Sequence, residues 1–185
     1  REMKRRTQYR VSTEYGYSSK FIYFVIHKTG TRSIFNALNF KREARKFYDP
    51  DLYKDYFTWT IVRNPWDRAV SAYVQKASKG YGPWRRCKNL TFPDFILNKR
   101  GIKDSHIRIQ STWIPPDIDF IGRFENLQED FNTVCDKIGI PKQQLPHKNK
   151  SKHKHYTEYY DEETKQIVAE KYAEDIKNFG YVFGD

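Results

Sequence analysis

Two short polar segments of this 185-residue sequence carry the residue types that bind phosphate or sulfate groups. A glycine in the first segment lets the backbone turn tightly and approach a ligand closely. Its lysine supplies a mobile point charge suited to a phosphate or to a leaving oxygen. The segment therefore predicts an oxyanion-binding loop, although an ordinary capped turn with a lysine is the alternative. Its residues are His27, Lys28, Thr29, Gly30, Thr31, Arg32 and Ser33.

The second polar segment begins at Arg63, within the sequence IVRNPWDRAVSAY. A guanidinium group can bind a phosphate through two parallel hydrogen bonds. Ser71 follows eight positions later, about two helical turns along, and can add a hydroxyl donor. Arg68 is a third candidate. The competing interpretation pairs Arg63 with Asp67 in an ion pair and packs Ser71 as a small residue between helices.

Each polar segment lies between an expected strand and an expected helix. Residues 21–26 (FIYFVI) form a continuous apolar run, which is typical of a buried strand, and residues 32–40 have helical spacing. Residues 57–62 (FTWTIV) predict a second strand, and Pro65 suits the first turn of a helix over residues 66–77. Helix N-termini and the carboxyl ends of strands in α/β sheets both favour anionic ligands.

The rest of the sequence continues to alternate short strands with helices, which predicts an α/β fold. We expect a short parallel sheet flanked by helices in a single domain at residues 21–185, preceded by a loose N-terminal arm at residues 1–20. Asn126 and Asp161 are the expected helix caps, and Gly139 and Gly180 the expected helix ends. The further expected elements are a strand at 118–124 and helices at 92–98, 127–138 and 161–178.

Composition limits the partners without choosing one. The formal net charge of +11 attracts polyanions, which include nucleic acids, anionic membranes, phosphorylated nucleotides and acidic glycans. Aromatic residues make up 17% of the chain and can build a core despite few aliphatic residues.

No apolar run approaches the roughly 20 residues of a membrane span. Cys87 and Cys135 have no metal-ligand spacing, and the sequence leaves their pairing open.

The two polar segments in this order resemble the motifs of the sulfotransferases that use PAPS (3′-phosphoadenosine-5′-phosphosulfate), most closely the carbohydrate-sulfotransferase branch with its small bacterial and viral relatives. The resemblance covers residues 21–183 and implies a P-loop-NTPase-like fold. It also implies that residues 27–33 hold the 5′-phosphosulfate of the donor, and that Arg63 and Ser71 hold its 3′-phosphate. His27 stands where the family often has proline.

Sulfuryl transfer to a hydroxyl requires a base for the acceptor proton and a cation for the charge on the bridging oxygen. Lys28 is the expected cation. His106 is the expected base, because DSHIRIQS resembles an H-x-x-P-Q segment of carbohydrate sulfotransferases, with Gln110 matching and Ile109 in place of proline. Glu125, which follows an expected strand, is the rival base.

The basic segment at residues 141–156 has three interpretations. By resemblance, it closes over the nucleotide and uses Ser151 and Lys152. It can instead attract an acidic acceptor, or it can be a solvated run of charge without a specific role.

We therefore expect an enzyme that transfers sulfate from PAPS to an acceptor hydroxyl, most simply on a glycan, and releases PAP (adenosine 3′,5′-bisphosphate). No metal is expected, because lysine and arginine can supply the charge, and neither nucleic acid nor membrane is an expected partner. Oligomeric state is open. The expected location is the cytoplasm, with the lumenal domain of a Golgi type II membrane protein as the alternative.

Two other functions compete with sulfate transfer. A kinase-like phosphotransferase would bind Mg-ATP, but the sequence lacks the G-x-x-x-x-G-K-[ST] loop of P-loop kinases. A basic nucleic-acid-binding module without catalysis would show strongly salt-dependent binding to oligonucleotides.

Overall fold

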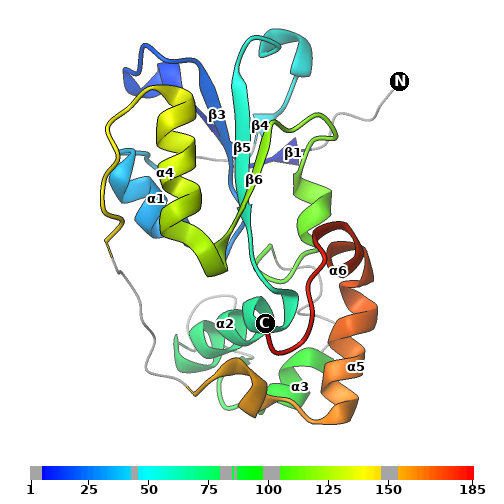
Figure 1. Cartoon of the computed structure of the whole chain (residues 1–185). Coiled ribbons are helices and arrows are strands. Elements are labelled where there is room, and N and C mark those ends of the chain that lie inside the picture. The colour runs from blue at the N-terminus through cyan, green and yellow to red at the C-terminus, as the bar shows by residue number, and fades with distance from the viewer. Residues whose placement is uncertain (1–5, 43–45, 80–84, 86, 98–104, 147–153) are drawn as a thin grey trace. The chain divides into compact units, whose positions relative to one another are not determined.

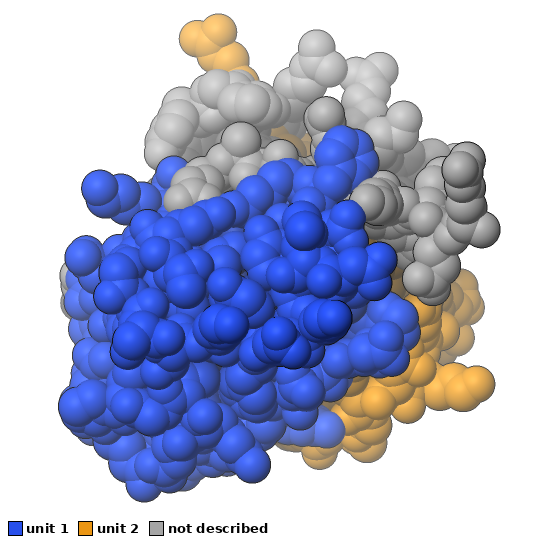
Figure 2. Space-filling model, turned by 90° about the horizontal axis from the view of Figure 1, so that it is seen from above, with its two compact units in different colours: residues 1–62, 113–150 blue, residues 63–112, 151–185 orange. Residues whose placement is uncertain are grey.

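The computed structural model describes residues 6–42, 46–79, 85, 87–97, 105–146 and 154–185. The chain divides into two compact units (Figure 2). The first unit comprises residues 1–62 and 113–150, and the second comprises residues 63–112 and 151–185. Of the two polar segments predicted to bind oxyanions, residues 27–33 belong to the first unit and residues 63–71 to the second.

A four-stranded sheet forms the centre of the first unit (Figure 1). Three of its strands run parallel to one another, and one edge strand runs antiparallel to its neighbour. The expected α/β class is confirmed, but the sheet is mixed. In order across the sheet, the strands are β2 (Tyr9–Val11), β3 (Phe21–Phe24), β5 (Phe57–Val62) and β6 (Phe120–Arg123). A separate antiparallel pair joins β1 (Arg6–Thr7) to β4 (Lys46–Phe47).

The antiparallel edge strand lies where the sequence predicted a loose arm. Tyr9 and Val11 of β2 are each only 2% exposed, and they pack with Ile22 and Phe24 of β3. A short 3₁₀ helix follows β2 at Ser12–Tyr15. The expectation of an irregular arm is therefore wrong for this stretch, because three strand residues are too few to show a period in the sequence. The boundary predicted after residue 20 stays a prediction.

One face of the sheet is covered by α1 (Thr31–Ala37) and α4 (Leu127–Ile138), which lie side by side (Figure 1). Successive side chains of a strand point to opposite faces, so alternate residues of β3 and β5 face these helices. The core on this side contains Phe21, Tyr23, Val25, Ile34, Leu38, Trp59, Ile61, Phe131, Val134 and Ile138, all buried.

The opposite face of the sheet is covered by an aromatic segment rather than by a helix of the same unit. Tyr48, Tyr53 and Tyr56 pack against the buried side chains of Ile22 and Phe24. The ring of Tyr48 stands edge-on to Phe24, with centroids 4.9 Å apart. A 3₁₀ helix at Pro50–Leu52 lies within this segment. The high aromatic content of the sequence thus supplies core area, as expected.

The carboxyl ends of β3 and β5 lie at the same edge of the sheet, because these neighbouring strands are parallel and pair Phe24 with Thr60. Residues 27–33 follow β3 after two further buried residues, Val25 and Ile26. Arg63 directly follows Val62, the last residue of β5. Each polar segment therefore continues from one of two adjacent parallel strands.

The second unit is helical. Its core includes Trp66, Val70, Phe95, Val168 and Tyr172, all buried. Its helices are α2 (Pro65–Lys79), α3 (Phe92–Leu97), α5 (Glu162–Lys171) and α6 (Ala173–Phe179), with 3₁₀ turns at Gln110–Trp113 and Tyr156–Tyr159.

The single helix expected at residues 161–178 is two helices. Tyr172 leaves the helical conformation between α5 and α6, with φ −109° and ψ 24°. Its side chain is 1% exposed, and its hydroxyl donates a hydrogen bond of 2.6 Å to the Ile107 carbonyl. A contact so distant in sequence cannot be read from helical periodicity. Asp161 caps α5 as predicted, since its Oδ1 accepts from the Thr164 amide at 2.8 Å.

Helix ends at glycine are confirmed, whereas one expected cap is wrong. Gly139 ends α4 and Gly180 ends α6, both in the left-handed conformation that glycine tolerates. Asn126 is the last residue of a 3₁₀ turn at Phe124–Asn126 and directly precedes α4, but its side chain makes no capping hydrogen bond. It donates instead to Asp130 Oδ1 at 3.2 Å, because that carboxylate lies one helical turn further along.

Candidate functional site: two oxyanion-binding segments

The first segment is held in an uncommon backbone conformation. Lys28 has a φ of 74° and Gly30 a φ of 82°, so two residues with left-handed φ angles flank Thr29. A lysine in this region is uncommon, because its Cβ crowds the following backbone. Such conformations persist only where surrounding contacts impose them, and they concentrate at ligand-binding sites. The lysine predicted to act on the donor is therefore also a locally strained residue.

Two independent observations favour glycine at position 30. Its left-handed φ favours glycine, and a Cβ added there would lie 2.7 Å from Leu127 Cδ2. Leu127 is the first residue of α4, so the loop packs directly against the start of that helix. The glycine that sequence reasoning assigned to ligand approach also permits this contact within the first unit.

The hydroxyl groups of the first segment bind the protein's own backbone. Thr29 Oγ1 and Thr31 Oγ1 both donate to the Ile26 carbonyl, at 2.8 and 2.9 Å. Ser33 Oγ donates to the Pro146 carbonyl at 2.8 Å. Each hydroxyl has one proton, so in this conformation these three side chains stabilise the loop. Donation by the hydroxyls to a phosphate stays a prediction.

Backbone amides are the other donors that this segment can offer. Helix α1 begins at Thr31, and the first amides of a helix have no carbonyl of their own helix to bind. His27 and Lys28 are half-buried, and Arg32 is exposed. The segment thus combines amide groups with cationic side chains next to a strand end, which is an arrangement suited to an anion.

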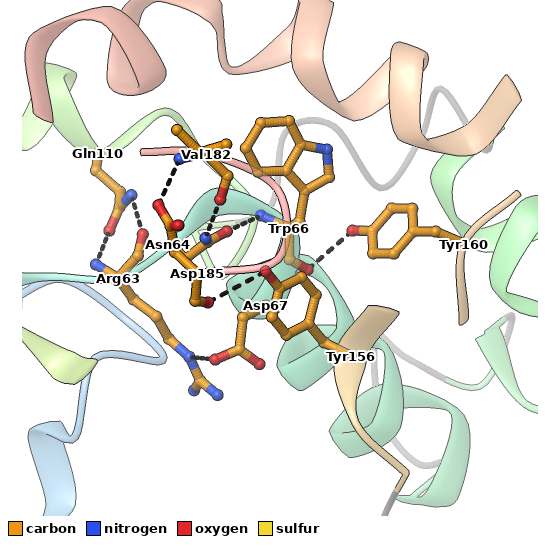
Figure 3. A network of polar contacts seen from close by, with 9 residues as sticks. All are labelled: Arg63, Asn64, Trp66, Asp67, Gln110, Tyr156, Tyr160, Val182 and Asp185. Carbon is orange, nitrogen blue, oxygen red and sulfur yellow. Dashed lines mark hydrogen bonds and ion pairs between the residues drawn. The ribbon is translucent and has the colours of Figure 1, made fainter. Parts of the chain in front are cut away.

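Arg63 leads the second segment and is held on several sides (Figure 3). Its side chain is buried, and its Nε donates to Asp67 Oδ2 at 2.8 Å. The Arg63–Asp67 ion pair, which the sequence analysis gave as an alternative to phosphate binding, is therefore present. The Gln110 side chain accepts from the Arg63 amide at 3.0 Å and donates to the Arg63 carbonyl at 2.9 Å. The guanidinium end of Arg63 points away from Gln110 (Figure 3).

Asn64 starts helix α2 and ties it to the C-terminal segment. Its Oδ1 accepts from the Trp66 amide at 3.1 Å, which is a helix-capping contact just ahead of Pro65. Its Nδ2 donates to the Val182 carbonyl at 2.9 Å (Figure 3). Sequence reasoning missed this role, although asparagine before a proline in a first helical turn is a recognisable signal.

The other two candidates of the second segment differ in their surroundings. Ser71 is half-buried and lies four residues after Asp67, on the same face of α2. Arg68 is 1% exposed, and its Nη1 donates to the Arg108 carbonyl at 2.8 Å. Arg68 therefore holds the segment that follows His106, and a phosphate-binding role for it stays a prediction.

His106 lies beside a buried lysine that sequence reasoning did not consider. Its Nδ1 is 3.3 Å from Nζ of Lys76, a residue of α2 that is 3% exposed. A protonated Lys76 donates to Nδ1 and leaves the proton of a neutral imidazole on Nε2. Action of His106 as a base at Nε2 requires the other arrangement, with the proton on Nδ1. The rival base, Glu125, is exposed in the first unit.

The remaining predictions concern the basic segment, a metal site and a membrane span. Ser151 and Lys152, with most of the basic segment around them, lie outside the described residues. Across the described ranges, no group of three or more histidine, cysteine or acidic residues is arranged to hold a metal ion. Within the same ranges, no helix has the length and apolar character needed to cross a membrane. The two compartments named above stay predictions.

Comparison with known proteins gives consistent results. The model of a group described as the sulfotransferase family matches residues 9–182. An uncharacterised protein of Archaeoglobus fulgidus is 33% identical over 96 residues, which are 50% of this chain and 75% of that protein. Carbohydrate sulfotransferase 14 of Homo sapiens is 26% identical over 113 residues, which are 46% of this chain and only 30% of that protein.

One solved structure also aligns with the chain. It is the crystal structure of a sulfotransferase from Alicyclobacillus acidocaldarius, with a TM-score of 0.40 and 17% sequence identity. The alignment covers 69% of this chain and 54% of the bacterial chain.

Proposed function

We propose that this chain, which belongs to the sulfotransferase family, transfers the sulfuryl group of PAPS to an acceptor hydroxyl and releases PAP. The observation that carries the proposal is the strained loop at the end of β3, where Lys28 and Gly30 both adopt left-handed φ angles. Such a loop places backbone amides and the half-buried Lys28 at the carboxyl edge of the strands, where α/β sheets bind ligands.

We assign the two ends of the donor to the two polar segments. Residues 27–33 bind the 5′-phosphosulfate, and Arg63 with Ser71 binds the 3′-phosphate. Two findings support this assignment: each segment continues from one of two adjacent parallel strands, and each carries a cationic side chain with a fixed backbone. Ser151 and Lys152 are proposed to close over the nucleotide, on the strength of the resemblance alone.

The reaction forms one sulfur–oxygen bond and breaks another. The acceptor oxygen attacks the sulfur of PAPS, and the bond from sulfur to the bridging oxygen of the 5′-phosphate breaks. Lys28 is proposed to stabilise the negative charge that develops on that bridging oxygen. His106 is proposed to take the acceptor proton at Nε2. This role requires a proton on Nδ1 and a neutral Lys76, so that Nδ1–H donates to Lys76 Nζ.

A sugar hydroxyl is the proposed acceptor. The human relative is named a carbohydrate sulfotransferase, and this chain matches 30% of its length. The net charge of +11 also favours the capture of an acidic glycan over that of a neutral alcohol.

A thermal-shift comparison tests the proposal. A ligand that binds only the folded state raises the melting temperature, by an amount that grows with its concentration relative to Kd. We expect a clear rise with PAP and little change with 5′-AMP, which lacks the 3′-phosphate. A rise with Mg-ATP alone would support the kinase-like alternative. Salt-sensitive binding of oligonucleotides without any response to PAP would support a nucleic-acid-binding module.

A further inference from the structure

We infer that Gln110 and Asp175 are positioning residues that fix Arg63 for the 3′-phosphate of the donor. The inference rests on the proposed function, because it adds a role to the residue that is proposed to bind that phosphate. Both residues belong to the second unit, and neither was assigned this role from the sequence.

Gln110 holds both main-chain groups of Arg63 with one side chain. It is 0% exposed, and its amide accepts from the Arg63 N–H at 3.0 Å and donates to the Arg63 carbonyl at 2.9 Å (Figure 3). This paired contact mimics the bonding that a neighbouring strand would give. The residue immediately after β5 therefore keeps a fixed backbone although it has left the sheet.

Asp175 in turn holds Gln110. Its carboxylate is 0% exposed, and Oδ2 accepts from the Gln110 amide N–H at 2.8 Å and from Gln110 Nε2 at 3.4 Å. The other oxygen, Oδ1, accepts from Ser111 N at 2.8 Å and from Ser111 Oγ at 2.5 Å. A buried carboxylate is costly unless it is hydrogen-bonded, so these contacts lock Asp175 and the start of the Gln110–Trp113 turn together.

The network converges on the residue whose guanidinium is proposed to bind phosphate. Gln110 fixes the Arg63 main chain, and Asp67 fixes the side chain through Nε at 2.8 Å. Arginine otherwise loses considerable rotamer freedom when it binds an anion. A guanidinium that is already oriented avoids much of this loss, so pre-organisation converts directly into affinity.

The test compares two ligands that differ only in the 3′-phosphate. Isothermal titration calorimetry would measure Kd for PAP and for 5′-AMP with the wild type, Gln110→Met and Asp175→Asn. Gln110→Met keeps the side-chain length and removes both bonds to Arg63. Tyr73→Phe is the matched control, since it removes one hydrogen bond of 3.0 Å to the Leu90 carbonyl in the same unit.

We expect Gln110→Met to weaken PAP binding about tenfold and to leave 5′-AMP binding unchanged, which corresponds to the loss of one or two net hydrogen bonds. Asp175→Asn should weaken PAP binding about three- to tenfold. Tyr73→Phe should change neither. Melting curves would identify a variant that fails to fold. If Gln110→Met or Asp175→Asn does so, the Kd values of the other variant test the inference.

Two results separate the inference from the function on which it rests. If the wild type does not prefer PAP over 5′-AMP, the assignment of the 3′-phosphate fails. If the wild type prefers PAP and the folded variants keep that preference, or lose affinity for both ligands equally, Gln110 and Asp175 have a merely structural role and the inference is overturned.

Discussion

The two segments that are proposed to bind oxyanions are supported in different ways. The loop at residues 27–33 has local support, through hydroxyl bonds from Thr29 and Thr31 to the carbonyl of Ile26, and distant support at Gly30 and Ser33. The segment at Arg63 takes its shape from distant residues, since its partner Gln110 lies 47 positions away and Asp175 a further 65. A local loop can be recognised in a sequence, whereas remote support becomes visible only in the folded chain.

This contrast predicts different responses to mutation. Changes within the first loop should affect both its conformation and the chemistry, because the strained residue and the cation are the same. Changes around the second segment should act on phosphate affinity through the orientation of Arg63, while the sulfuryl-transfer step itself stays intact.

The largest effect is expected from Lys28→Ala. Lys28 is proposed to stabilise the leaving oxygen, and removal of such a cation should lower kcat at least about 100-fold. Alanine meets the same left-handed φ as lysine, so a melting curve of the variant separates a loss of folding from a loss of turnover. Radiolabelled sulfate transfer measures the loss, with Lys137→Ala, an exposed lysine of α4 in the same unit, as the control. Normal turnover in the Lys28 variant would exclude the assigned role.

Gly30→Ala should have the next largest effect. Alanine is unfavourable at the left-handed φ of this position, and the added Cβ would lie 2.7 Å from the Leu127 side chain. We expect a loss of about 2 to 4 kcal/mol in the free energy of unfolding. Gly139→Ala is a matched control, since it has a φ of 70° but no atom within 4 Å of the added Cβ. Chemical denaturation would compare the two, and an equal loss would contradict the packing argument.

Asn64→Ala should have a smaller effect that reaches the second segment. It removes the cap on the Trp66 amide and the bond to Val182, at a cost of about 1 kcal/mol. Asp161→Ala removes a similar cap at the start of α5. Both variants should lose similar stability in melting experiments, but only Asn64→Ala should also weaken PAP binding. A similar loss of PAP affinity in both would mean that capping has no local effect on Arg63.

The smallest effect concerns Lys171. Burial, together with the nearby charge of Arg68, lowers the pKa of this lysine from 10.5 to about 8. The unfolded chain therefore binds more protons than the folded chain between these two values, and stability rises with pH in that window. Relative to Lys171→Met, the wild type should gain about 0.5 kcal/mol per pH unit between pH 8 and pH 10. Parallel denaturation curves at several pH values would measure the difference, and a pH-independent difference would argue against it.

The sequence predicted the features that depend on neighbouring residues. Strand β5 begins and ends where its apolar run does, and Gly139 and Gly180 end helices as their backbone freedom requires. The sequence also predicted a polar turn between a strand and a helix at residues 27–33, which the structure has; oxyanion binding by this turn stays a prediction.

The features that depend on distant contacts escaped prediction. Strand β2 exists because three residues pair with β3, and Tyr172 divides the last helix because its hydroxyl binds Ile107. Gln110 was matched only through a family resemblance. Its contact with Arg63, and the contact of Asp175 with Gln110, follow from tertiary packing that no local period encodes.

The central claim is that the two segments bind opposite phosphates of one nucleotide. Titration calorimetry with 5′-AMP and 3′-AMP, on Lys28→Ala and Arg63→Ala, tests it most directly. The claim predicts that Lys28→Ala weakens only the 5′-phosphate ligand and that Arg63→Ala weakens only the 3′-phosphate ligand. It is contradicted if each substitution weakens both ligands to the same extent, or if neither changes the affinity for either.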